Sequence, residues 1–92
     1  MNYYIGMSEK QEIFTLMGGR VRMRRGTYNP TSDAVWLAAF APTKNINSVL
    51  DVGIGSGGVS LCILANNPSA TITGLDTSDQ MLANAADNAK LN

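Results

Sequence analysis

The spacing of apolar positions changes along the chain, and this change predicts an α/β protein that opens with a hairpin. Residues 13–17 (IFTLM) and 20–25 (RVRMRR) are short β-favouring runs on either side of Gly18-Gly19. A Gly-Gly pair between such runs is typical of a two-residue hairpin turn, because primed turns need positive φ. In the second run, Val21 and Met23 are expected on one face and the arginines on the other.

Downstream of a loop over 26–30, the pattern predicts a helix. It is expected to begin with Thr31 or Ser32 as N-cap, to carry Asp33 in its first turn and to stop near Pro42. Tyr28 and Trp36, the aromatic residues near its start, are expected in a core rather than stacked on a base.

Two further β-rich runs, 48–53 (SVLDVG) and 70–76 (ATITGLD), each precede a predicted helix. The first is continuously apolar before its aspartate and is expected to be covered on both faces. The helix after it, VSLCILANN, is apolar nearly all round. Ser78 is predicted to cap a last helix whose apolar stripe comprises Leu82, Ala85, Ala86 and Ala89. Strand, Gly-rich turn, helix, strand, helix is the opening of a parallel, doubly wound sheet.

Composition narrows the class of protein without naming a partner. The chain has 92 residues, 45% apolar and 15% charged, which fits one small globular domain. Seven basic residues balance seven acidic ones. A single cysteine, Cys62, cannot form an internal disulfide and is expected to be a buried apolar residue. There is no histidine, so we expect no metal site. Neither a signal peptide nor an apolar run long enough for a bilayer is seen, so we expect a cytoplasmic protein without membrane contact.

The candidate chemistry lies in VLDVGIGSGG, residues 49–58. Gly53 and Gly55 allow a tight turn and the close approach of a ligand, and Gly57 or Gly58 is expected to let the next helix pack near the sheet. Asp76 follows Gly55 by 21 residues and ends the second strand, where a carboxylate can accept hydrogen bonds from both ribose hydroxyls. The turn and Asp76 together predict a nucleoside site, although a purely structural turn and a helix-capping Asp76 remain alternatives.

The choice of nucleoside depends on Asp51. Gly53, Gly55 and Gly58 satisfy the dinucleotide pattern G-x-G-x-x-G as well. An aspartate two residues before the first glycine repels a pyrophosphate but attracts a sulfonium and an amino group. The alternative is a structural carboxylate bonded to nearby backbone amides.

These residues carry a family resemblance. DVGIGSG, followed by LD at 75–76, resembles the first two cofactor motifs of class I S-adenosylmethionine-dependent methyltransferases. With GGRVRMRR and YNPTSDAVWLAAFAP upstream, the chain resembles the bacterial tRNA1(Val) adenine methyltransferase-like group, which modifies the exocyclic amine of an adenine in RNA; glutamine-modifying relatives share much of this block. The resemblance implies an incomplete Rossmann-like class I methyltransferase fold. It divides the chain into an N-terminal tail (1–12), a hairpin and loop (13–30) and the first part of an S-adenosylmethionine-binding domain (31–92).

The resemblance also implies roles for single residues. Asp51 and Gly53 would lie along the methionine portion of S-adenosylmethionine, and Gly55 would lie under the cofactor. Asp76 would hold the ribose hydroxyls. The remaining implied cofactor residues are Asp33 on the N-terminal side of the pocket, Ile54 and Ser56 in the turn, and Thr77 near the adenine.

Four of the seven basic residues cluster in the hairpin: Arg20, Arg22, Arg24 and Arg25. They predict either a phosphate-contacting stripe for RNA, with tRNA as the expected partner, or the solvated face of an exposed hairpin.

The chain lacks the Asn-Pro-Pro-Tyr-type motif with which amine methyltransferases of this kind grip the target base. We therefore expect a fragment, inactive by itself, with catalytic residues beyond Asn92 and with a sheet edge through which it self-associates. A protein-glutamine methyltransferase, an NAD-binding oxidoreductase domain and a non-catalytic binding module remain alternatives.

Overall fold

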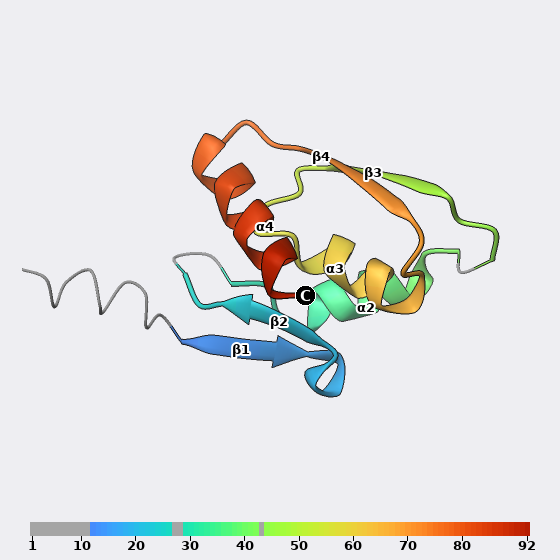
Figure 1. Ribbon diagram of the computed structural model, residues 1–92, viewed down its shortest axis with the longest axis horizontal. Helices are drawn as coiled ribbons and strands as arrows, with labels where there is room; N and C mark the ends of the chain where they lie inside the picture. Colours follow the sequence, from blue (N-terminus) through green and yellow to red (C-terminus); the bar gives the residue numbers. More distant parts are fainter. Residues whose placement is uncertain (1–11, 27–28, 43) are drawn as a thin grey trace, which may run out of the picture.

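The computed structural model describes residues 12–26, 29–42 and 44–92 and shows an α/β arrangement with two separate two-stranded sheets (Figure 1). All of the predicted N-terminal tail except Glu12 lies outside the described residues, as does Tyr28.

The first sheet is an antiparallel hairpin of β1 (Ile13–Leu16) and β2 (Val21–Arg24). Val21 and Met23 are buried and Arg22 is exposed, as the alternation predicts. The prediction of a two-residue turn at Gly18-Gly19 is wrong. The last pair is Leu16 with Val21, so four residues connect the strands, and the short 3-10 turn η1 (Met17–Gly19) lies within them. Met17 takes a positive φ of 53° together with both glycines, which widens the turn beyond a primed hairpin.

Three helices and a parallel sheet follow in the predicted order. The elements are α2 (Ser32–Phe40), β3 (Ser48–Val52), α3 (Gly58–Asn66), β4 (Thr71–Leu75) and α4 (Asp79–Leu91). β3 pairs in parallel with β4, from Ser48 beside Thr71 to Val52 beside Leu75. Thr31 is the N-cap position of α2, and the hydroxyl of Ser78 accepts from the backbone N–H of Met81 at the start of α4. The predicted α/β class is therefore confirmed.

The core lies where α3 meets the hairpin and α2. Its buried members come from β2, α2 and α3: Val21, Met23, Ala38, Leu61, Cys62 and Ile63. Figure 1 shows α3 between the hairpin on one side and the β3–β4 sheet on the other. Cys62 is fully buried, as expected.

Two expectations about burial are wrong. Leu50 and Val52 of β3 are 61% and 74% exposed, because among the described residues the helices cover only the opposite face of the sheet. Trp36 is 68% exposed rather than in the core. Ala34 and Ala38, one turn apart, are the residues that α2 buries, so Trp36 between them points away.

The apolar stripe of α4 is only partly covered. Leu82 and Ala85 are half-buried, Ala86 and Ala89 are exposed, and the buried residue of this helix is Asn88. Within the described residues no helix is both long and apolar enough to cross a membrane.

Candidate cofactor site

A cavity of about 450 Å³ lies between the start of α2 and the glycine turn after β3. Five of the predicted cofactor residues line it: Asp33, Gly53, Ile54, Gly55 and Ser56. The prediction did not include the other lining residues, which are Asn29, Pro30, Thr31, Ala34, Leu37, Gly58 and Val59. The cavity thus joins the segment before and within α2 to the turn that the glycine spacing had indicated.

The glycine turn has an open face toward the cavity. Gly53 and Gly55 have φ values of 76° and 58°, which favour glycine. A methyl group added to either would meet no protein atom within 4 Å. Packing therefore leaves room for side chains at these two positions, and it is the positive φ that disfavours them. The open space beside the two glycines leaves their peptide groups accessible to a ligand.

The turn is fastened to the end of β4. The backbone N–H groups of Gly53 and Ile54 both donate to the carbonyl oxygen of Leu75, at 2.7 and 2.9 Å. The side chain of Ile54 lies over Gly74, where any larger residue would overlap it. The large Ile54 side chain is thus accommodated against the sheet.

The sequence suggested that Gly57 or Gly58 lets α3 pack close to the sheet, but neither glycine has the sheet as its neighbour. A methyl group on Gly58 would lie 2.7 Å from Cβ of Pro30, and one on Gly57 would lie 3.5 Å from Cβ of Ala85. Gly58 instead allows α3 to approach the cavity wall before α2, and Gly57 allows it to approach α4.

Asp76 bonds directly to the glycine turn. Its Oδ2 accepts from the backbone N–H of Gly55 at 2.9 Å, and its Oδ1 accepts from that of Ser78 at 2.9 Å. These hydrogen bonds, from Ser78 first and then Gly55, lower the pKa of the Asp76 carboxyl below its usual range. Asp76 and the exposed Thr77 lie at the end of β4 and do not line the cavity itself. Because a carboxylate has about four lone-pair sites, these backbone donors do not exhaust its capacity to accept from hydroxyl groups.

Asp51 points toward α3. Its Oδ2 accepts from the hydroxyl of Ser60, which is buried, at 2.6 Å. Its partner is thus a side-chain hydroxyl and not the backbone amides considered from sequence, and Asp51 does not line the cavity.

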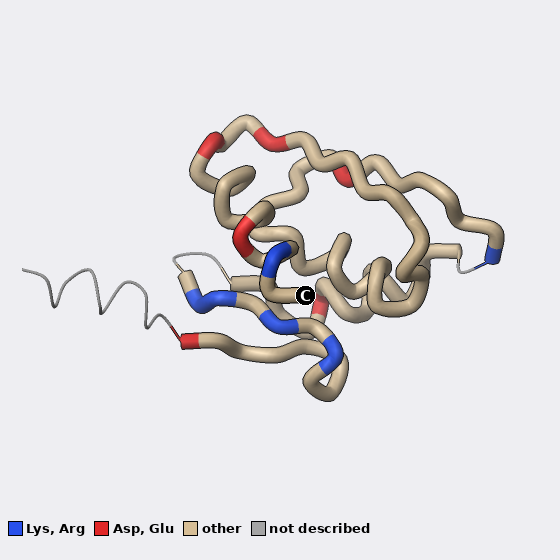
Figure 2. Tube along the Cα trace, viewed as in Figure 1, with Lys and Arg blue, Asp and Glu red and all other residues tan. Residues whose placement is uncertain are grey.

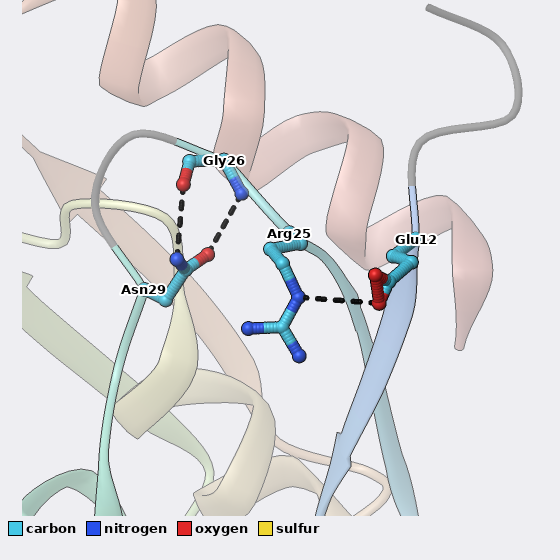
Figure 3. A network of polar contacts seen from close by, with 4 residues as sticks. All are labelled: Glu12, Arg25, Gly26 and Asn29. Carbon is cyan, nitrogen blue, oxygen red and sulfur yellow. Dashed lines mark hydrogen bonds and ion pairs between the residues drawn. The ribbon is translucent and has the colours of Figure 1, made fainter. Parts of the chain in front are cut away.

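Asn29 shapes the N-terminal wall. Its side-chain amide donates to the Gly26 carbonyl at 2.9 Å and accepts from the Gly26 N–H at 2.7 Å (Figure 3). Beside this loop, Arg25 pairs with Glu12 at 3.7 Å and lies over the Phe14 ring. The side-chain bonds of Asn29 join it to Gly26, and Asn29 lines the cavity beside Pro30.

The arginines gather along the hairpin, as Figure 2 shows, and two of them reach helix ends. The Arg20 guanidinium donates to the carbonyl of Ala65 at 2.6 Å and to Oδ1 of Asn66 at the end of α3. Arg22 donates to the carbonyl of Leu91 at the end of α4. Cations at helix C-termini stabilise the orphan carbonyls, so these two residues have structural partners whatever else they bind.

Sequence reasoning missed Asn88. It is 2% exposed, its Nδ2 donates to the carbonyl of Ser56 at 2.9 Å, and its Oδ1 accepts from the N–H of Arg24 at 2.9 Å. One signal was available, since asparagines recur at every fourth residue, at 84 and 88 on one face of α4 and at its C-cap, 92. Across the residues that the structure describes, no cluster of three metal-ligating side chains occurs.

Comparison with known proteins agrees with this geometry. Residues 49–92 match a family described as a methyltransferase domain. The fold is a partial Rossmann-like methyltransferase fold. In this fold the glycine turn and Asp76 occupy the ends of neighbouring parallel strands, as they do here.

Three curated relatives illustrate the similarity. Release factor glutamine methyltransferase of Cereibacter sphaeroides is 36% identical over 72 residues, covering 78% of this chain and 26% of that protein. The enzyme of the same name from Caulobacter vibrioides is 48% identical over 53 residues, 58% of this chain and 18% of that protein. Trans-aconitate 2-methyltransferase of Escherichia coli is 42% identical over 52 residues, covering 56% of this chain and 21% of that protein. The chain thus spans about a quarter or less of the relatives it matches, and no solved structure matches it significantly.

Proposed function

We propose that this chain binds S-adenosylmethionine in the cavity beside the glycine turn and forms the cofactor-binding part of a methyltransferase. One observation carries the proposal: an open glycine turn, bonded to the Asp76 carboxylate, faces a cavity whose single charged lining residue is Asp33. Its volume of about 450 Å³ lies within the usual range of small-molecule sites. When bound, the cofactor supplies a methyl group on a positively charged sulfur.

The charges of the site favour a cation over a pyrophosphate. Asp33 attracts a sulfonium or an α-amino group across the cavity. No lysine or arginine occurs among the lining residues, so a dinucleotide phosphate would find no basic partner there. This argues against the NAD-binding alternative.

The other groups of the site either contact the ligand or support the glycine turn from behind. Gly53 and Gly55 present peptide groups at close range, and Asp76 offers its remaining acceptor capacity to ribose hydroxyls. Asp51 and Ser60 lie behind the turn and act on it through β3 and α3. The chain's contribution is thus binding and orientation of the cofactor, which is the dominant requirement for direct methyl transfer.

For the methyl acceptor, a glutamine side chain of a protein is the candidate that the comparisons support. Five similar proteins bear the name release factor glutamine methyltransferase, and the alignment with one of them covers 78% of this chain. An amide nitrogen would then receive the methyl group.

An adenine amine in RNA, with tRNA as partner, is the second candidate, and the basic hairpin favours it (Figure 2). Because the side chains of Arg20 and Arg22 donate to carbonyls at helix ends, RNA contacts are tested at Arg24 and Arg25 instead. The pair Arg24→Glu and Arg25→Glu is matched by Lys44→Glu and Lys90→Glu, which change the net charge equally but lie off the hairpin.

The cofactor is tested by calorimetric titration of the chain with S-adenosylhomocysteine and, separately, with NADH. Binding of the first compound alone supports the proposal, and binding of NADH alone contradicts it. For the acceptor, tRNA affinity is measured over a range of salt concentrations. If the hairpin pair lowers affinity and the salt slope while the lysine pair does not, RNA is the partner. Equal responses favour the protein substrate.

A further inference from the structure

Asn88 connects the glycine turn, which is the proposed cofactor turn, to the hairpin through a single buried side-chain amide. Its donor end bonds the Ser56 carbonyl, and its acceptor end bonds the Arg24 N–H of β2. Only one orientation of the amide satisfies both partners, since a carbonyl accepts and an N–H donates. The side chain is therefore fixed at both ends.

Asn92, the C-cap residue of α4, binds the same strand. Its Oδ1 accepts from the Arg22 N–H at 2.8 Å, and its Nδ2 donates to the Arg22 carbonyl at 2.7 Å. Asn88 and Asn92 thus satisfy alternate backbone groups along β2, as a neighbouring strand would. The two asparagines differ in burial and in their further partners. Asn88 is buried and holds Ser56 of the cavity, whereas Asn92 is exposed and donates to the Asn88 carbonyl.

We propose that Asn88 is a positioning residue that fixes the cofactor turn by holding the Ser56 carbonyl. Gly53, Gly55 and Gly57 all have positive φ, and a turn with three such glycines loses much conformational entropy when it becomes ordered. An anchor on Ser56 removes part of that loss before a ligand arrives, which strengthens binding. As far as it concerns S-adenosylmethionine, this inference rests on the proposed function.

The test compares Asn88→Asp with Asn92→Asp. Each variant keeps the oxygen that accepts from β2 and loses the side-chain NH₂ group. Asn88→Asp thereby loses the bond to the turn, and Asn92→Asp loses the bonds to the Arg22 and Asn88 carbonyls. In the ligand-free protein, amide hydrogen exchange is followed at Gly55 and Gly57, whose N–H groups bond to Asp76 and to the Ile54 carbonyl, and at Cys62 in the core.

We expect Asn88→Asp to accelerate exchange at the two glycines about ten-fold more than at Cys62, and Asn92→Asp to show no such selectivity. A purely structural role would accelerate all three amides equally, and that result overturns the proposal. Affinity for S-adenosylhomocysteine should fall about ten-fold in Asn88→Asp and less than about two-fold in Asn92→Asp.

The two readouts separate the two proposals. If the unmutated chain does not bind S-adenosylhomocysteine, the proposed function fails while glycine exchange still decides the role of Asn88. If Asn88→Asp does not fold, exchange of the side-chain NH₂ groups in the unmutated chain decides. Side-chain exchange at Asn88 at the rate of the Gly57 N–H supports the inference, and exchange at the rate of the Cys62 amide instead overturns it.

Discussion

Asp76 and Gly55 are joined by a hydrogen bond of 2.9 Å from the glycine N–H to the aspartate Oδ2, across 21 positions of sequence. The bond ties the end of β4 to the turn after β3, and thereby holds the two parts of the candidate site at a fixed separation. Since the same carboxylate also accepts from Ser78, one side chain organises both the cofactor turn and the approach to α4.

Replacement of Asp76 should therefore weaken cofactor binding. For Asp76→Ala we expect the affinity for S-adenosylhomocysteine to fall about ten-fold or more, because the ribose acceptor and the Gly55 contact are lost together. Asp79→Ala is the control, since Asp79 is an exposed acid in the first turn of α4. Calorimetric titration measures the affinity of both variants for S-adenosylhomocysteine, and equal losses of affinity would contradict a specific role of Asp76.

Stability should depend on pH through the same carboxyl. Its pKa is lowered in the folded state by the N–H groups of Ser78 and Gly55, so its contribution is fully present above the unfolded value, about 3.9. It is lost as the pH falls through the lower folded pKa. The difference in Tm between the unmutated chain and Asp76→Asn should thus shrink below about pH 4. A difference that stays constant to the lowest pH at which the protein is folded would contradict this.

Gly58 should tolerate no side chain while Pro30 is present. Gly58→Ala places a methyl group 2.7 Å from Pro30 Cβ, and such overpacking costs about 1–3 kcal/mol. Urea unfolding of Gly58→Ala, Pro30→Gly and the double variant measures the coupling between the two positions, because Pro30→Gly removes the Cβ that the new methyl group would overlap. The double variant should be more stable than the sum of the single effects, and strict additivity would exclude the clash.

Arg20 should stabilise α3 from outside that helix. No basic residue occurs in the last turn of α3, and the hairpin arginine donates to its terminal carbonyl at Ala65. Arg20→Met keeps much of the aliphatic stem and should lower the free energy of unfolding by about 0.3–1 kcal/mol, less at high salt. Lys44→Met serves as the control. A loss that does not depend on salt would indicate packing of the stem instead.

Cys62 should react only after unfolding. The side chain is fully buried in the core, and burial raises the pKa of the Cys62 thiol, so little thiolate forms near neutral pH. A chromogenic disulfide reagent should modify the native chain much more slowly than the urea-unfolded chain. Comparable rates in both states would place the thiol at an accessible surface.

The resemblance to a methyltransferase and the alternation of elements could be recognised from local sequence. The helix starts at Thr31 and Ser78 and the β-favouring runs are local preferences, and each was found where expected, although only Ser78 makes a side-chain capping bond. The width of the hairpin turn was not, because it depends on Met17 adopting positive φ beside two glycines. The exposure of Leu50, Val52 and Trp36 was also missed, since apolar runs do not reveal which of their faces other elements cover.

The sequence by itself determined the order of strands and helices, the glycine turn and the carboxylate at the end of the second strand. These features follow from backbone preferences and from a spacing that parallel strands impose. Only the tertiary structure decided the partners of Asn88, Arg20 and Gly58. Ser56 and Arg24 lie 32 and 64 positions from Asn88 along the chain. Contacts at such separations depend on how helices pack against the hairpin, and no local pattern of residues encodes that packing.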